Sequence, residues 1–136
     1  MAKNYKNYKP TIKEKFMNIK MKEYFRIKLV TWKKELLKES NQTINNLKKE
    51  ENSSKPDLTD RAAEEIERSF ELRTRDRERK LINKIDAALK RINDGSYGYC
   101  EETGEPIGIK RLEARPIATL SIEAQEMHEK KEKKIN

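Results

Sequence analysis

Apolar residues recur along the first half of the chain at the spacing of a helix face. From Phe16 onward, four of them follow one another at intervals of four, three and four residues: Phe25, Leu29, Trp32 and Leu36. Such a 4-3-4 spacing places side chains on one seam of a helix. The seam then becomes polar, with Ile44 and Leu47 as its later apolar members, and "SSKP" at residues 53–56 breaks it. The pattern predicts a long first helix that fades near residue 53.

A second helical pattern begins at about Asp60. Thr59 or Asp60 is placed to cap it by accepting a hydrogen bond from a free backbone N–H of the first turn. Ile66 and Phe70 form an early apolar pair, and a second 4-3-4 seam follows, made of Leu81, Ile85, Ala88 and Ile92. Residues 93–95, "NDG", are typical of a helix C-terminus. The pattern therefore predicts a second helix of similar length to the first.

Two such helices with narrow apolar seams and a short connection predict an antiparallel coiled-coil hairpin. The scarcity of glycine and proline, four of each, agrees with a mostly α-helical fold. We expect a flexible basic lead over residues 1–15 and the hairpin over residues 16–95, with its tip near residues 53–60. Residues 96–136 are expected to form a small zinc-ribbon-like head and a C-terminal helix.

Charge changes this picture at the N-terminus. Charged residues make up 41% of the chain and hydrophobic ones 34%, which favours a thin, solvated shape. Residues 1–34 hold eleven Lys or Arg and two Glu, a local +9 in a chain of net charge +8, so the remainder sums to −1. This basic arm is suited to nucleic acid or another acidic surface, and equally to a solvated tail. No apolar run or secretory signal is visible, so we expect no membrane span and a cytoplasmic protein.

The head carries the spacing of a zinc ribbon without its ligands. Four residues stand at the positions of the C-x₂-C-x₁₇-C-x₂-C frame: Cys100, Thr103, Ser121 and Ala124. Structural zinc takes four Cys or His ligands, and three sulfurs are missing here. We therefore expect no bound zinc, with Cys100 serving as a small buried hydrophobe. Packing would replace the metal, through five residues in particular: Ile107, Ile109, Leu112, Leu120 and Ile122.

Two charged groups are candidates for binding. Asp57 and Asp60, three residues apart at a helix start, could share a Mg²⁺ or meet cations on a partner, and could equally be capping residues. A basic group near the base could hold a phosphorylated ligand or an acidic protein surface, or be an ordinary solvated face: Lys80, Lys84, Lys110, Arg111 and Arg115. No catalytic triad, phosphate-binding loop or HExxH motif is present, so we expect no enzyme.

The segments "DRAAEE", "ELRTRDRERKLI", "YGYC" and "LEARP" together resemble the DksA/TraR family of bacterial transcription factors, over about residues 16–134. The resemblance implies a coiled-coil hairpin that enters the secondary channel of RNA polymerase and changes promoter-complex stability. It implies action in the stringent response with guanosine tetraphosphate (ppGpp), without sequence-specific DNA binding. It also implies that zinc can be lost without loss of function, and we expect a monomer.

The resemblance also assigns roles to individual residues. The tip that approaches the polymerase active site would comprise Asp57, Asp60 and Ala62. Arg77 would contact the channel rim. A ppGpp site shared with the polymerase would include Leu81, Lys84 and Arg115, with Gln125 where the family usually has a lysine. A lost cation there is expected to weaken the contact with phosphate.

Two other functions share these features. In a Gre-like factor, Asp57 and Asp60 would help hold a Mg²⁺ and stimulate transcript cleavage by the polymerase. A basic coiled-coil protein would instead bind RNA or the ribosome through residues 1–34. We favour the polymerase regulator, because the resemblance includes the tip as well as the coiled coil.

Overall fold

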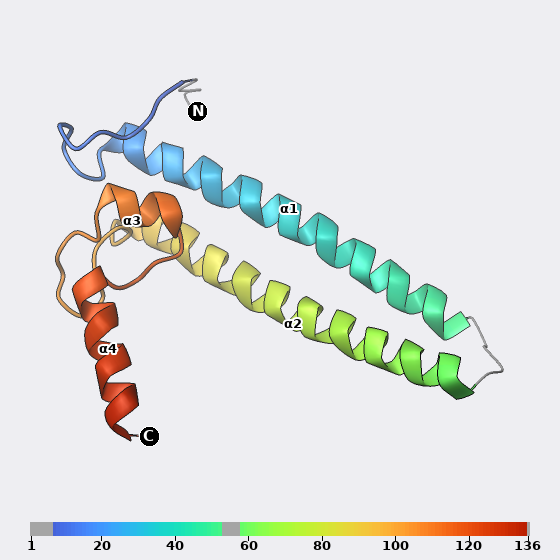
Figure 1. The fold of residues 1–136 in the computed structure, drawn as a ribbon. Helices are drawn as coiled ribbons and strands as arrows, with labels where there is room; N and C mark the ends of the chain where they lie inside the picture. The colour runs from blue at the N-terminus through green and yellow to red at the C-terminus, as the bar shows by residue number, and fades with distance from the viewer. Residues whose placement is uncertain (1–6, 53–57, 136) are drawn as a thin grey trace. The chain divides into compact units, whose positions relative to one another are not determined.

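The computed structural model describes residues 7–52 and 58–135. It contains four helices (Figure 1): α1 (Ile19–Asn52), α2 (Leu58–Asp94), α3 (Ile109–Ala114) and α4 (Ile122–Ile135). Within the described ranges no strand forms, and the only bridge joins Tyr99 and Pro106 in antiparallel fashion. None of the helices in these ranges has a stretch apolar enough to cross a membrane. The predicted mostly α-helical class with a C-terminal helix is confirmed.

The chain divides into two compact units. The head unit comprises the residues up to Val30 and those from Ile85 onward, and the hairpin unit comprises Thr31–Lys84. Both long helices contribute residues to each unit. The division at residues 15/16 and 95/96 that the sequence predicted stays a prediction.

The head unit is organised by the start of α1 and the end of α2. Asn18 caps α1, because its Oδ1 accepts a hydrogen bond of 2.8 Å from the backbone N–H of Met21. Four large side chains of the two helices are completely buried: Met21, Phe25, Leu29 and Ile85. Burying a side chain of this size contributes about 1.5–3 kcal/mol. The predicted seams of both helices are therefore confirmed at this end.

The end of α2 leads directly into the head. Gly95 has a φ of +87°, a left-handed conformation that glycine adopts without strain. Three consecutive backbone N–H groups, of Gly95, Ser96 and Tyr97, donate to the carbonyl oxygen of Arg91 at 2.9–3.1 Å. The predicted "NDG" terminus is confirmed. The turn directs Tyr97 onto Phe25, with ring centroids 5.7 Å apart.

The five apolar residues expected to form the core of the head differ in how deeply they are buried. Ile107 and Leu112 are buried, while Ile109 and Leu120 are half-buried. The expectation for Ile122 is wrong, since its side chain is 54% exposed. Ile122 lines an apolar groove of about 480 Å³, together with Ile12 of the lead and Phe16 just after it.

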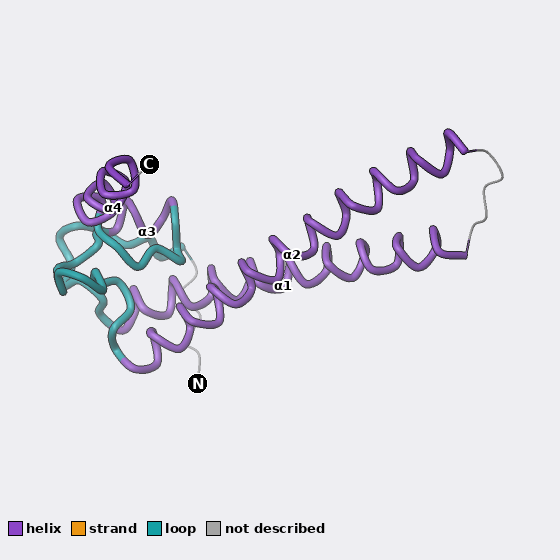
Figure 2. Tube along the Cα trace, turned by 90° about the horizontal axis from the view of Figure 1, so that it is seen from below, coloured by secondary structure: helices purple, strands orange, loops and turns teal. Residues whose placement is uncertain are grey.

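In the hairpin unit, the second part of α1 and the first part of α2 run side by side in opposite directions (Figures 1 and 2). Leu36 is buried here, as predicted, and so is Glu78. The expected seam pair is wrong, because Ile66 and Phe70 are exposed. Continuing the 3-4 repeat of Ile85 back along α2 places Glu78 in the seam and leaves Ile66 and Phe70 outside it.

Candidate functional site

The tip residues lie at the start of α2. Asp57 is outside the described residues, while Asp60 and Ala62 are exposed. Asp60 lies in the first turn, where a carboxylate interacts favourably with the positive end of the helix dipole. Thr59 and Asp60 both fall inside α2, which begins at Leu58, so the expectation that one of them is the N-cap is wrong. Both Asp60 and Ala62 are accessible to a partner.

Three further candidates follow along α2 within the hairpin unit. Arg77 and Lys84 are exposed and Leu81 is half-buried. Arg77 and Lys84 are seven residues apart, which places them on the same side of the helix. The hairpin unit therefore presents two cations in one direction.

The other two predicted ppGpp residues, Arg115 and Gln125, belong to the head unit. Arg115 is exposed just after α3, and its backbone N–H donates to the carbonyl oxygen of Arg111 at 2.7 Å. Gln125 is half-buried in α4, with its Nε2 3.5 Å from Oε1 of Glu129. Within the head unit, the candidate ppGpp residues thus supply one cation and one neutral amide.

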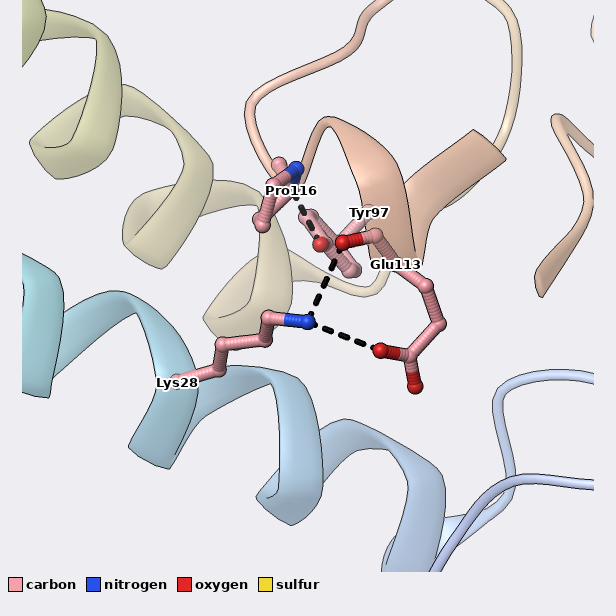
Figure 3. A network of polar contacts seen from close by, with 4 residues as sticks. All are labelled: Lys28, Tyr97, Glu113 and Pro116. Carbon is pink, nitrogen blue, oxygen red and sulfur yellow. Dashed lines mark hydrogen bonds and ion pairs between the residues drawn. The ribbon is translucent and has the colours of Figure 1, made fainter. Parts of the chain in front are cut away.

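The loop that carries Arg115 is tied to α1 and to the turn that follows α2 (Figure 3). Lys28 of α1 donates to the backbone oxygen of Glu113 at 3.1 Å and to its Oε2 at 2.7 Å. Tyr97 donates to the carbonyl oxygen of Pro116 at 2.8 Å. Glu113 and Pro116 are two residues before and one after Arg115, so both flanks of this cation are held. Lys28 and Glu113 are 85 residues apart, and no motif in the sequence pointed to their pairing.

The ionisation of these groups reflects their surroundings. Burial raises the pKa of Glu113, but hydrogen bonds from Lys28 and Tyr24 outweigh burial and lower the pKa overall. Tyr24 has a pKa of about 12, raised mainly by burial and then by Glu113. Burial likewise raises the pKa of Tyr97. Glu113 is therefore charged at neutral pH, and both tyrosines keep their protons.

Two of the other zinc-ribbon positions, Thr103 and Ser121, lie close to the sulfur of Cys100, which is 3% exposed. Burial raises the pKa of this thiol, yet hydrogen bonds from the Thr103 side chain and from backbone groups of Ser121, Thr103 and Glu102 lower it to about 6. These polar neighbours make the thiol more acidic than an ordinary cysteine. The expected burial of Cys100 is confirmed, but its lowered pKa does not fit the expected role of a small hydrophobe.

The remaining positions of the frame do not fit zinc. Ser121 precedes α4, and its Oγ accepts a hydrogen bond of 3.2 Å from the backbone N–H of Ala124, so this hydroxyl is a helix cap. Ala124 fills the fourth position with a methyl group and is 3% exposed. In the described part of the chain, no three His, Cys, Asp or Glu side chains are grouped to hold a metal ion. One thiol with two hydroxyls and a methyl group is not a structural zinc site.

One further contact joins this region to α4. In α4, the Nε2 of His128 contacts Oε1 of Glu102. Both side chains are about half exposed. The contact connects the loop between Cys100 and Thr103 to the C-terminal helix.

Comparisons with known proteins cover both units. The N-terminal domain of the DnaK suppressor protein DksA matches residues 21–92, and the prokaryotic dksA/traR C4-type zinc finger matches residues 95–130. The RNA polymerase-binding transcription factor DksA of Caulobacter vibrioides (strain NA1000 / CB15N) is 60% identical over 127 residues, covering 93% of this chain and 89% of the relative. The protein of the same name in Escherichia coli (strain K12) is 46% identical over 122 residues, covering 90% and 80%.

A solved structure is also similar. The transcription factor DksA2 from Pseudomonas aeruginosa has a TM-score of 0.81 and 43% sequence identity, covering 87% of this chain and 90% of that one. This chain and DksA2 are therefore similar in both sequence and fold over most of their lengths.

Proposed function

The chain belongs to the DksA/TraR family, and on this premise we propose that it is a transcription regulator that binds bacterial RNA polymerase. The observation that carries the proposal is its 60% identity, over 93% of its length, to a protein named RNA polymerase-binding transcription factor DksA. The regulator acts in the cytoplasm and performs no chemistry of its own. The helices of the hairpin enter the secondary channel of the polymerase and change the stability of promoter complexes.

Within this proposal, the start of α2 is the effector. Asp57, Asp60 and Ala62 approach the polymerase active site, where the carboxylates interact with cationic groups or a bound metal ion. Exposure of Asp60 and Ala62 supports this role. Arg77 contacts the channel rim, and its exposure on α2 is compatible with such a contact.

The regulator also responds to ppGpp. Four residues form its side of the site shared with the polymerase: Leu81, Lys84, Arg115 and Gln125. Phosphate binding depends on cations, and the neutral amide of Gln125 gives less attraction than a lysine would. We therefore expect a smaller effect of ppGpp than in relatives with a lysine there. The firmly held flanks of Arg115 support its role as a fixed phosphate contact.

The head works without zinc. Three features replace the metal that holds a four-cysteine ribbon together. They are the polar groups around the Cys100 sulfur, the helix cap made by Ser121 and the buried methyl group of Ala124. Packing against α1 and α2 completes the support. The base of the regulator is then independent of metal supply.

The proposal is tested by transcription from a ribosomal RNA promoter with purified polymerase. We expect the wild-type chain to inhibit, Asp60→Asn to lose most of the inhibition, and the matched exposed variant Glu67→Gln to keep it. Addition of ppGpp should increase wild-type inhibition, and Gln125→Lys should increase it further. Equal inhibition by the wild type and Asp60→Asn would refute the effector role, and no inhibition by any form would refute the function. Stimulated transcript cleavage in a backtracked complex would indicate a Gre-like factor instead.

A further inference from the structure

Two large apolar side chains of the hairpin unit lie in solvent next to each other. Ile66 is 72% exposed and Phe70 is 64% exposed. They stand four residues apart in α2, one helical turn, so they form a single apolar patch. A single exposed apolar residue is ordinary, but adjacent ones of this size are typical of a surface that a partner covers.

The patch is continuous with residues already proposed to meet the polymerase. Ala62, Ile66, Phe70, Arg77 and Lys84 follow one another at intervals of four, four, seven and seven residues. At about 100° per residue, all five point within an arc of about 80° on the helix. Arg73 and Lys80 fall inside the same arc. We call these seven exposed residues the partner face of α2: Ala62, Ile66, Phe70, Arg73, Arg77, Lys80 and Lys84.

We infer that Ile66 and Phe70 are the apolar anchor of this face against RNA polymerase, an inference that rests on the proposed function. The polymerase surface that receives them is an apolar recess bordered by acidic groups. The anchor lies between Ala62 at one end and the cations Arg77 and Lys84 at the other, so a partner that contacts both ends covers it. Interfaces commonly have this arrangement, with desolvated apolar residues at the centre and charged ones at the rim.

The charge of the partner face favours the polymerase over a second copy of this chain. The face holds four cations and no carboxylate: Arg73, Arg77, Lys80 and Lys84. Parallel packing of two such faces would set like charges against one another. An acidic rim on a different protein would instead attract the cations of the partner face.

The test is the dissociation constant of the full chain for purified core RNA polymerase, measured by competition with a fluorescently labelled wild-type chain. We expect Ile66→Ser and Phe70→Ser each to weaken binding roughly tenfold, because burial of one such side chain is lost. Leu72→Ser is the matched control, since Leu72 is 43% exposed in the same helix but lies outside the partner face. It should change binding less than about twofold.

Salt separates apolar from charged contributions. The loss caused by Phe70→Ser should persist at high salt, whereas the loss caused by Arg77→Ala should shrink as ions screen its charge. Circular dichroism should show the same helix content for all variants, because the substituted side chains are exposed.

Each alternative outcome has a separate meaning. Wild-type binding that neither Ile66→Ser nor Phe70→Ser weakens would overturn the anchor and leave the proposed function standing. An equal loss in Leu72→Ser would also overturn it. Failure of the wild type to bind polymerase would overturn the function and the anchor together. A dimer in analytical ultracentrifugation that Phe70→Ser dissociates would assign the patch to a second copy.

Discussion

The two units of this chain differ in what lies inside them. Of thirteen buried apolar residues in the described ranges, all except Leu36 belong to the head unit. The hairpin unit instead buries Glu78, and its largest apolar side chains on α2 are exposed. The head therefore supplies most of the hydrophobic stabilisation, while the hairpin is a helical pair that keeps its surface available for a partner. Most of the hydrophobic stabilisation and the surface proposed to meet the polymerase thus lie in different parts of one chain.

The largest difference between the units should appear when their interiors are mutated. Phe25→Ala, in the head, should lower the free energy of unfolding by about 3–5 kcal/mol, since a buried aromatic ring is lost and a cavity remains. Chemical denaturation followed by circular dichroism measures this loss. The exposed Phe70→Ala, in the hairpin, should change the same quantity by less than about 0.5 kcal/mol. Similar losses in both would contradict the division of roles.

Glu78 is buried in the hairpin unit, and its substitution should stabilise that unit. Its Oε2 is buried and has no hydrogen-bond partner among the described residues. Glu78→Leu should therefore stabilise the hairpin by about 1–2 kcal/mol, since it replaces an unsatisfied polar group with an apolar one. Hydrogen exchange of α2 amides in the hairpin unit measures the change. Faster exchange in the variant would contradict the expectation.

The same residue gives the hairpin a pH dependence. Burial raises the pKa of Glu78, and the charge of Glu39 raises it further. Because the folded pKa lies above the unfolded value, the contribution to stability is fully present below the unfolded pKa and is lost as the pH rises through the folded pKa. Hydrogen exchange in the hairpin should thus accelerate over this rise, and Glu78→Gln should abolish the dependence. A dependence unchanged in Glu78→Gln would assign it to another group.

The stability of the head should depend on pH less strongly and in the opposite direction. The folded pKa of Glu113 is lowered overall, so its contribution is present above the unfolded pKa and is lost as the pH falls through the folded value. Lys28→Met should lower the free energy of unfolding at neutral pH by about 0.5 kcal/mol, because the pair is partly exposed and screened. Denaturation of the head at pH 7 and pH 4 measures both effects. A larger loss at pH 4 than at pH 7 would contradict this sign.

Much of this organisation follows from local pattern. The seams of both helices and the turn after Asp94 were predictable, since spacing and glycine chemistry act over a few residues. The outward position of Ile66 and Phe70 was missed because hydrophobicity was followed without its register. Extending the 3-4 repeat of Ile85 backward would have indicated Glu78 in the seam.

Two contacts of the site were not predicted from the sequence, for reasons other than register. Pairing of Lys28 with Glu113 depends on tertiary packing and has no local signal. Ser121 was interpreted only as a lost zinc ligand, although a serine directly before a helical segment is also a common N-cap. The two interpretations are compatible, since one substitution removes a ligand and supplies a cap.

If packing and hydrogen bonds hold the head without metal, the hairpin can act whether or not zinc is present. Thermal unfolding of the purified chain with and without a strong zinc chelator tests this independence, with zinc content measured by mass spectrometry. We expect well under one zinc per chain and the same melting temperature in both conditions. One zinc per chain, with a melting temperature that falls by many degrees in the chelator, would contradict this independence.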